Sequence, residues 1–353
     1  MAVAQALELI DSDVHPALPA PGALDRYLPA RWRAYRERYG IRGYGKGIVP
    51  RQTPAAARAD AWPPAGGPPG SDLAFLRSQL LDRWGVDRAV LNAVVVSGRI
   101  RNLEFSAAYS HACNDWIVDG WLDPEPRLRA SIEVAYEFAE AAAAEVRLRA
   151  ADPRFVQVAF FARTAEPLGR RRYWPIYDAA QECGLPVGIH PGGGGGAPLS
   201  AVGTPSFYFE EHAGVMATYQ EQLTSLVFEG VFGRFPRLRV VLIEGGFGWL
   251  PPLLWRLDQA WERHRDELVH VDRPPSEIVR ERVWLTTQPM EEPPRAHDFE
   301  TLLAELDMDD RLLYSSDYPH WDFDAPEHAF PVRLDEDRRR RFMVRNAARL
   351  YGF

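Results

Sequence analysis

The chain has 353 residues, of which 46% are hydrophobic, so it is long and apolar enough to form a large α/β domain with an extensive core. Its formal net charge of -8 argues against a surface that binds nucleic acid or another polyanion. It contains no long uninterrupted apolar stretch, and no basic region precedes the apolar residues at its start. We therefore expect a cytoplasmic protein that does not bind membranes and whose two cysteines stay reduced.

Short apolar runs alternate with segments of helical periodicity along the chain. The runs expected to form strands lie, in order, at 7–11, 87–98, 127–136, 154–163, 185–192, 239–246, 281–290 and 311–320. The segments with an apolar stripe at helical spacing lie at 103–122, 137–152, 170–184, 210–235 and 248–268. Continuous apolar runs bounded by Gly and Pro are typical of parallel strands that are buried on both faces. The alternation predicts an α/β fold, a (β/α)8 TIM barrel that residues 1–353 form as a single domain.

Two segments interrupt this repeat. Residues 17–71 follow the first strand and are rich in Pro, Gly, Ala and Arg, so we expect an insertion loop over the barrel mouth, with a surface excursion as the alternative. Residues 191–212 begin with Pro and a run of five glycines. That run lacks the Lys and Ser/Thr of a phosphate-binding loop, and it predicts a pliable wall of the pocket.

Histidines and carboxylates follow four of the expected strands, at the barrel end where active sites of this architecture gather. These candidates are Asp13, His15, His190, Glu244, Asp317 and His320. A buried carboxylate is costly unless a cation or good hydrogen bonds compensate it. Taken singly, Asp13 and His15 are typical of a hydrogen-bonding pair in a core, and His320 is also typical of a partner to a ligand. Their coincidence at strand ends predicts a metal site.

Further side chains near these positions predict a pocket for a small, largely apolar molecule. The aromatic residues expected to line it are Phe207, Tyr208, Phe247, Trp249 and Trp321, with packing of the barrel rim as the alternative for each. The polar residues expected to orient a substrate carboxylate are Arg163, His212 and Gln288. Trp249, Trp255 and Trp261 exceed the needs of one inward helical stripe and predict a candidate homodimer contact.

Four motifs together resemble the amidohydrolase superfamily over almost the whole chain: IDSDVHP, GIHPGG, IEGGFGWLP and YSSDYPHWD. The resemblance implies metal ligands on strands one, five and eight, which His15, His190 and Asp317 match. Asp13 stands where the superfamily carries the first of two paired histidines, and Glu244 stands where it carries a histidine on strand six. On strand four, Gln157 stands where dinuclear hydrolases carry a modified lysine.

These two exchanges make the site harder and more anionic, which suits iron or manganese better than zinc. In this respect the chain resembles the non-heme dinuclear iron monooxygenases of the superfamily, such as the platensimycin-type diterpenoid hydroxylase and the α-aminoisobutyric acid hydroxylase. That resemblance implies hydroxylation of a C–H bond with O2 and an electron donor. It also implies two divalent ions, Fe/Fe or Fe/Mn, one held by Asp13, His15 and Asp317 and the other by His190, Glu244 and His320. Asp317 and Glu244 would be the catalytic residues.

The superfamily also contains metal-dependent hydrolases and non-oxidative decarboxylases, and this alternative stays open. In that case zinc or manganese is sufficient, and either an activated water or Asp317 acts as the acid or base. A non-catalytic binding protein with a degraded site is the third option. The retention of all six polar groups speaks against it.

Overall fold

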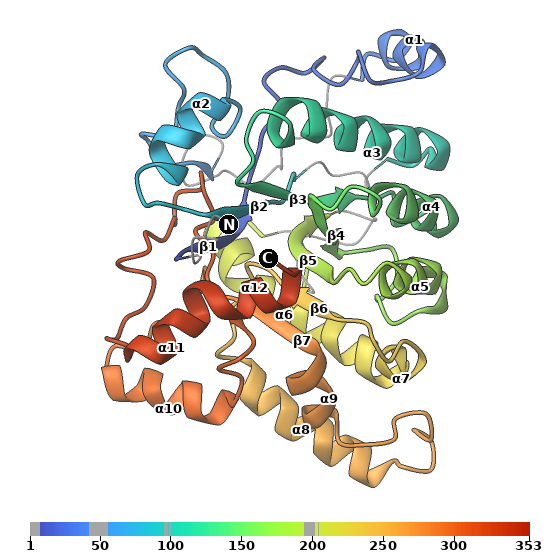
Figure 1. Cartoon of the computed structure of the whole chain (residues 1–353). Helices are drawn as coiled ribbons and strands as arrows, with labels where there is room; N and C mark the ends of the chain where they lie inside the picture. Colours follow the sequence, from blue (N-terminus) through green and yellow to red (C-terminus); the bar gives the residue numbers. More distant parts are fainter. Residues whose placement is uncertain (1–7, 42–55, 95–97, 99, 194–201, 204) are drawn as a thin grey trace, which may run out of the picture.

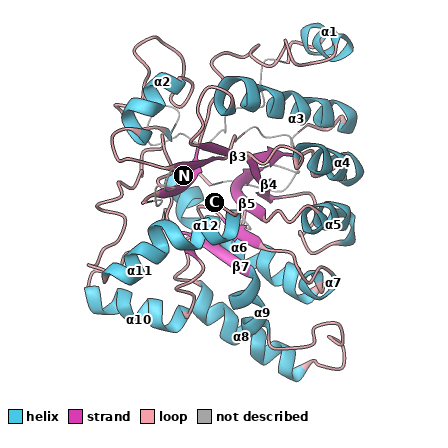
Figure 2. Ribbon diagram, in the orientation of Figure 1, coloured by secondary structure: helices cyan, strands magenta, loops and turns pink. Residues whose placement is uncertain are grey.

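A computed structural model describes residues 8–41, 56–94, 98, 100–193, 202–203 and 205–353. Its centre is a sheet of eight parallel strands whose order in space follows their order in the chain. The strands are β1 (Ile10–Val14), β2 (Arg88–Leu91), β3 (Leu128–Glu133), β4 (Phe155–Arg163), β5 (Val187–Gly193), β6 (Val240–Leu242), β7 (Val283–Thr286) and β8 (Leu312–Leu313). Helices enclose the strands (Figure 1; Figure 2). The predicted (β/α)8 TIM barrel is confirmed.

The sheet closes on itself between the segments that contain β8 and β1. The backbone N–H of Ser12 donates to the carbonyl oxygen of Tyr314 at 2.9 Å. Beyond the end of β8, the N–H of Asp317 donates to the carbonyl oxygen of Asp13 at 3.1 Å. The closure therefore brings two of the predicted metal ligands, more than 300 positions apart in the sequence, into direct backbone contact.

The helices form the outer layer of the barrel and its ends. They are α1 (Ala30–Arg38), α2 (Leu73–Leu76), α3 (Leu103–Ile117), α4 (Ala139–Arg149), α5 (Trp174–Glu182), α6 (Tyr208–Phe228), α7 (Val231–Arg234), α8 (Leu250–Arg263), α9 (Pro275–Arg282), α10 (Ala296–Leu306), α11 (Glu336–Arg340) and α12 (Asn346–Tyr351). Among the described helices, none is long and apolar enough to cross a membrane. Cys113 and Cys183 are both free thiols, as expected.

The start and orientation of α3 show how the sequence fixes these helices. Asn102 precedes the helix in an extended conformation, and its side chain accepts a hydrogen bond from the N–H of Phe105 at 3.0 Å. Phe105, Tyr109 and Cys113 then recur at intervals of four residues, and all three are buried. The cap and the apolar stripe together begin the helix and turn one face toward the strands.

The interior of the barrel contains a polar network rather than apolar side chains alone. The hydroxyl of Ser131 donates to Asn92 Oδ1 at 2.6 Å, and Gln157 Nε2 donates to Ser131 Oγ at 2.9 Å. The hydroxyl of Tyr351, at the end of α12, donates to Gln157 Oε1 at 3.2 Å. In Figure 1 α12 lies in front of the strands, where it closes one end of the barrel. The last helix is thus tied to the inside of the sheet.

Several strands are shorter than the apolar runs suggest. The runs at 239–246 and 311–320 shrink to Val240–Leu242 and Leu312–Leu313, so Glu244 and Asp317 lie beyond their strands. Both residues have a left-handed backbone, with φ of +57° and +58°, which cannot continue a strand. The first strand, β1, begins later than expected and includes Asp13.

The described part of the insertion at 17–71 pairs with the segment that follows β8. Ala57 and His320 form an antiparallel bridge, and the N–H of Arg58 donates to the carbonyl oxygen of Pro319 at 3.0 Å. Residues 42–55 of the insertion lie outside the described part of the chain. The insertion thus contacts the loop that carries a predicted ligand, and its role as a cover over the substrate stays a prediction.

The expected tryptophan surface on α8 is wrong for two of its three members. Trp249 and Trp261 are buried within the chain, and the indole N–H of Trp261 donates to the carbonyl oxygen of Val271 at 2.8 Å. Trp255 is exposed. The helix and the loop before it bury Trp249 and Trp261 on the inward side, and a homodimer contact through Trp255 stays a prediction.

A glycine that joins the insertion to β1 provides a test of this fold. Gly70 has φ of +76°, and a Cβ there would collide with the carbonyl oxygen of His15. Gly85 has φ of +65° with no atom within reach of a Cβ. We expect Gly85→Ala to lower the free energy of unfolding by about 1–2 kcal/mol through backbone strain. Gly70→Ala should cost about 1–3 kcal/mol more through the collision. Urea unfolding measures both, and equal losses would contradict the packing described for Gly70.

Candidate metal centre

The structure brings all six predicted ligands together at the carboxyl ends of the strands. They form two overlapping groups of possible ligands, and within each group the ligand atoms lie within 4.8 Å of one another. The first group is Asp13, His15, His190 and Glu244, and the second is His15, Glu244, Asp317 and His320. This grouping differs from the expected one, because Asp317 pairs with His320 and the two groups share His15 and Glu244.

Asp317 is the centre of the second group. Its Oδ1 atom lies 2.8 Å from His15 Nε2 and 2.6 Å from His320 Nδ1. His15 Nε2 also lies 3.3 Å from Asp13 Oδ1, so one imidazole stands between two carboxylates. Both carboxylates are fully buried. The left-handed backbone of Asp317 turns its side chain back toward β1, which makes this contact possible.

Four buried ligand atoms have no hydrogen-bond partner among the described residues: Asp13 Oδ2, His190 Nε2, Glu244 Oε2 and Asp317 Oδ2. His190 Nε2 and Glu244 Oε2 are only 2.9 Å apart, yet their orientation does not form a hydrogen bond. Buried polar atoms are rarely left without a partner. Their convergence, with oxygen and imidazole donors, fits a hard divalent cation such as manganese or iron.

Burial and mutual charge set the protonation of the cluster. Burial, reinforced by the charge of Asp317, raises the pKa of Glu244 well above its usual value. Burial also disfavours the charged forms of His15 and Asp317, but the charges and hydrogen bonds of neighbouring side chains outweigh burial and favour these forms. The carboxylates Asp13 and Asp317 hold the pKa of His15 well above its usual value, while His320 and His15 hold that of Asp317 below its usual value. A divalent cation must therefore displace protons from Glu244 and His15.

Asn92 holds the first two ligands in place and was missed in the sequence. Its side-chain Nδ2 donates to Asp13 Oδ1 at 2.8 Å, and its backbone carbonyl oxygen lies 2.8 Å from His15 Nδ1. The hydrogen bond from Ser131 to Asn92 Oδ1 fixes the orientation of the amide. Groups of this kind set the direction and basicity of metal ligands. The one available signal was an amide inside the apolar run at 87–98.

Part of the predicted substrate pocket gathers beside the loop after β8. Tyr208, His212 and Trp321 lie in mutual ring contact, with centroids 5.5 to 6.4 Å apart. His212 Nε2 lies 3.1 Å from Asp322 Oδ2, and this hydrogen bond raises the pKa of His212. Gln288 Nε2 donates to the carbonyl oxygen of Asp322 at 2.7 Å.

The remaining predicted pocket residues are placed differently. Arg163 is buried and lies 3.1 Å from Glu211, so its charge already has a partner. Phe247 is fully buried and packs against Phe299 of α10, with ring centroids 6.4 Å apart. The indole N–H of Trp249 donates to the carbonyl oxygen of Gly245 at 2.8 Å. Phe207, by contrast, is largely exposed. The structure does not gather these four with the metal centre, and their contact with a substrate stays a prediction.

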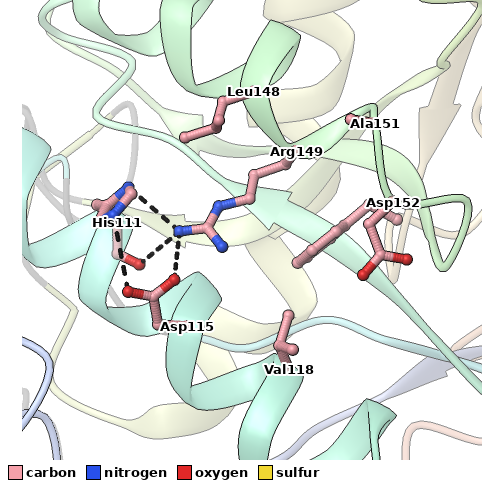
Figure 3. A pocket seen from close by; sticks show the side chains of 8 residues that line it. His111, Asp115, Val118, Leu148, Arg149, Ala151 and Asp152 are labelled. Atoms are coloured by element: carbon pink, nitrogen blue, oxygen red, sulfur yellow. Dashed lines mark hydrogen bonds and ion pairs between the residues drawn. The ribbon is translucent and has the colours of Figure 1, made fainter.

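A hollow lined in part by charged side chains lies outside the barrel, beside α3 and α4 (Figure 3). Arg149 is its centre: its Nη2 donates to Asp115 Oδ1 at 2.7 Å and to the carbonyl oxygen of His111 at 3.2 Å. Its Nε donates to Glu145 Oε1 at 2.7 Å. Arg149 thus pairs with one carboxylate on each of α3 and α4, and none of the six predicted metal ligands lines the hollow.

The comparisons with known proteins agree with the fold. The amidohydrolase family model matches residues 10–353. A sequence search of the curated proteins finds no match. Among solved structures, an amidohydrolase from Mycobacterium avium subsp. paratuberculosis K-10 has 22% identity and a TM-score of 0.72, over 99% of this chain and 100% of that chain.

Two further solved structures that resemble this chain are decarboxylases. The 2,6-dihydroxybenzoate decarboxylase from Rhizobium has 18% identity and a TM-score of 0.69, over 98% of this chain and 99% of that chain. The dihydroxybenzoic acid decarboxylase from Polaromonas sp. JS666, with bound manganese and an inhibitor, has 19% identity and a TM-score of 0.69, over 98% of this chain and 97% of that chain. At these identities the likeness shows the fold.

Replacement of Asn92 tests its part in holding the metal ligands. Asn92→Ala should weaken Mn²⁺ binding by about 10- to 100-fold, because Asp13 loses its hydrogen bond and its orientation. Titration of the purified protein with Mn²⁺, followed by electron paramagnetic resonance, measures the change. Asn346→Ala is the matched control, since this buried amide donates to the carbonyl oxygens of Asp309 and Leu312 instead. Equal Mn²⁺ affinity in the wild type and Asn92→Ala would show that Asn92 does not position the site.

The raised pKa of Glu244 predicts a pH dependence of metal binding. As the pH rises, the protons that Mn²⁺ must displace are lost, so the apparent affinity should increase with pH. Glu244→Gln removes one of these protons. We expect the slope of the logarithm of the affinity against pH to fall by about one in this variant. Calorimetric titration in two buffers of different ionisation enthalpy counts the protons that are released when Mn²⁺ binds. An unchanged count in Glu244→Gln would show that Glu244 does not release one of them.

Proposed function

We propose that this chain, which belongs to the amidohydrolase family, is a metal-dependent decarboxylase that removes CO2 from a small, largely apolar carboxylic acid without oxygen or an electron donor. The observation that carries the proposal is the cluster of six ligand side chains with the Asp317–His320 pair inside it. The cluster supplies a place to bind an anionic group, and the pair supplies a proton donor beside it. The named decarboxylases with the same barrel support this choice of reaction.

A divalent cation, for which we favour manganese, would be held by Asp13, His15, His190 and Glu244, the group that does not include Asp317 and His320. When bound, it supplies the positive charge that holds the substrate's carboxylate among three acidic side chains. The manganese in the Polaromonas decarboxylase supports this choice of ion. His15 and Asn92 keep the carboxylate of Asp13 oriented toward the same point.

The proton that decarboxylation requires has a candidate donor in His320. Loss of CO2 breaks a C–C bond and leaves its electron pair on carbon, which must then take a proton. Asp317 is a poor donor because its neighbours hold its pKa below the usual value. His320 is partly exposed, and Asp317 fixes its Nδ1, so its Nε2 is the free nitrogen. In this proposal Asp317 orients the imidazole and His320 gives the proton.

The pocket side chains above this pair complete the proposal. The hydrogen bond to Asp322 favours the protonated form of His212, which offers a second cationic group for a substrate anion. Tyr208 and Trp321 add apolar surface next to it. Such walls exclude water from the carbon that receives the proton.

A dinuclear iron monooxygenase is the second candidate function. The specific observation in its favour is that six donors form two overlapping groups, with three carboxylates and three histidines between them. Such a set is enough to hold two hard ions. This reading requires O2 and an electron donor, which the decarboxylase reading does not, so the two are separable by experiment.

The two functions predict opposite results under nitrogen. Protein loaded with Mn²⁺ should release CO2 from 2,6-dihydroxybenzoate without O2, as measured by the evolved gas. His320→Ala should lower kcat by about 10²- to 10⁴-fold through loss of the acid, with Mn²⁺ content unchanged. His328→Ala, at an exposed histidine, is the control. No CO2 from this acid under nitrogen, together with O2 uptake by the iron-loaded protein in the presence of a reductant, would reject the decarboxylase in favour of the monooxygenase.

A further inference from the structure

The strand ends at the barrel mouth differ in whether they supply candidate metal ligands. All six candidate ligands come from β1 and the residue that follows it, from β5, and from the loops after β6 and β8. The carboxyl ends of β2, β3 and β4 contribute no ligand, and a small cavity lies there, against His190. Its lining includes Asn92, Val94, Glu133, Phe161, Gly188 and His190. The cavity thus directly adjoins the metal centre.

Glu133 is the only carboxylate among the residues that line this cavity. It is 2% exposed, and its Oε1 has no hydrogen-bond partner among the described residues. Ser131, two positions earlier on β3, bonds to Asn92 inside the barrel, so Glu133 lies on the same inward face. Burial alone raises the pKa of Glu133 well above its usual value.

Among the described residues, each of the other carboxylates classed as buried accepts at least one hydrogen bond, whereas no hydrogen bond to the side chain of Glu133 is found. Glu125 accepts hydrogen bonds from Arg77 and Arg127, and Glu145 accepts them from Arg149 and Asn114. A buried polar group without a partner costs free energy that a bound ligand can recover. The unpartnered Oε1 of Glu133 is therefore a candidate hydrogen-bond acceptor for a ligand group that enters the cavity.

The size and walls of the cavity limit what can enter. It holds little more than one water-sized group. Phe161 forms one wall, and its ring stands nearly perpendicular to that of His190 at a centroid distance of 6.1 Å. A neutral carboxyl group favours a neutral partner, and the acidic cluster next to it repels a second anion. A hydroxyl group of a substrate meets these limits.

We propose that Glu133 contacts the substrate and selects for a hydroxyl group that enters the cavity beside His190. The proposal rests on the proposed function, because it places a substrate carboxylate at the metal centre and its hydroxyl group in the adjoining cavity. The Glu133 carboxyl group accepts the hydroxyl hydrogen through its unpartnered Oε1. No bond is made or broken in this contact, so Glu133 determines specificity and leaves the proton transfer to His320.

Binding of simple acids to the manganese-loaded protein tests this assignment. Calorimetry would compare benzoate with 2-, 3- and 4-hydroxybenzoate. For the wild type we expect at least one isomer to bind about tenfold more tightly than benzoate, the size of one good buried hydrogen bond. Glu133→Leu should abolish that preference and leave benzoate binding unchanged. Glu133→Gln should keep most of it, since an amide still accepts a hydrogen bond.

Controls separate selection from a merely structural role. Glu145→Gln alters a buried carboxylate outside the barrel, and it should leave the preference unchanged even if stability falls. If Glu133→Leu does not fold, Glu133→Asp replaces it, because the shorter side chain should lose most of the preference. A preference that survives in Glu133→Leu, or in Glu133→Asp where that variant replaces it, overturns the proposal. A wild type that prefers none of the three isomers over benzoate overturns it as well.

The outcomes for Glu133 and for decarboxylation are distinguishable. A preference that depends on Glu133, without release of CO2 from any isomer, would retain the hydroxyl subsite and reject the decarboxylase. Release of CO2 with no dependence of binding on Glu133 would retain the decarboxylase and reject the subsite.

Discussion

The closure of the barrel between its last and first strands is the contact on which the site depends. There the backbone joins Asp317 to Asp13, and His15 stands between their side chains. Two buried carboxylates this close repel each other, and each loses its hydration. An imidazole between them compensates part of that cost, and a divalent cation would compensate more. The same hydrogen bonds that complete the sheet therefore also create a strongly anionic pocket.

A chain of polar contacts supports that closure from within the barrel. It leads from the hydroxyl of Tyr351 through Gln157, Ser131 and Asn92 to the carboxylate of Asp13. Each member is held by its neighbour, so the amide and hydroxyl groups have defined orientations. Because buried networks of this kind are strong only when every member is satisfied, the position of the final helix matters at the metal centre. The two ends of the chain are thereby coupled.

The sequence predicts the repeating architecture and the proximity of the six candidate ligands well, because apolar runs mark the strands and these residues follow them. It predicts strand lengths poorly, since the left-handed turns at Glu244 and Asp317 leave no mark in hydrophobicity. The contact of Asp317 with His15 depends on the closure of the sheet, which no local pattern encodes. Asn92 and Glu133 were missed for a related reason: each looks like an ordinary residue within a strand run until its neighbours in space are known.

The antiparallel bridge between Ala57 and His320 ties the segment after β1 to the imidazole that we assign as proton donor. Any exchange of that segment between related chains would replace the backbone against which His320 rests. Sequence divergence in the insertion would then alter the reactivity of His320 without any substitution among the candidate metal ligands. Loops grafted into an engineered variant would thus carry a change in the rate of proton transfer with them.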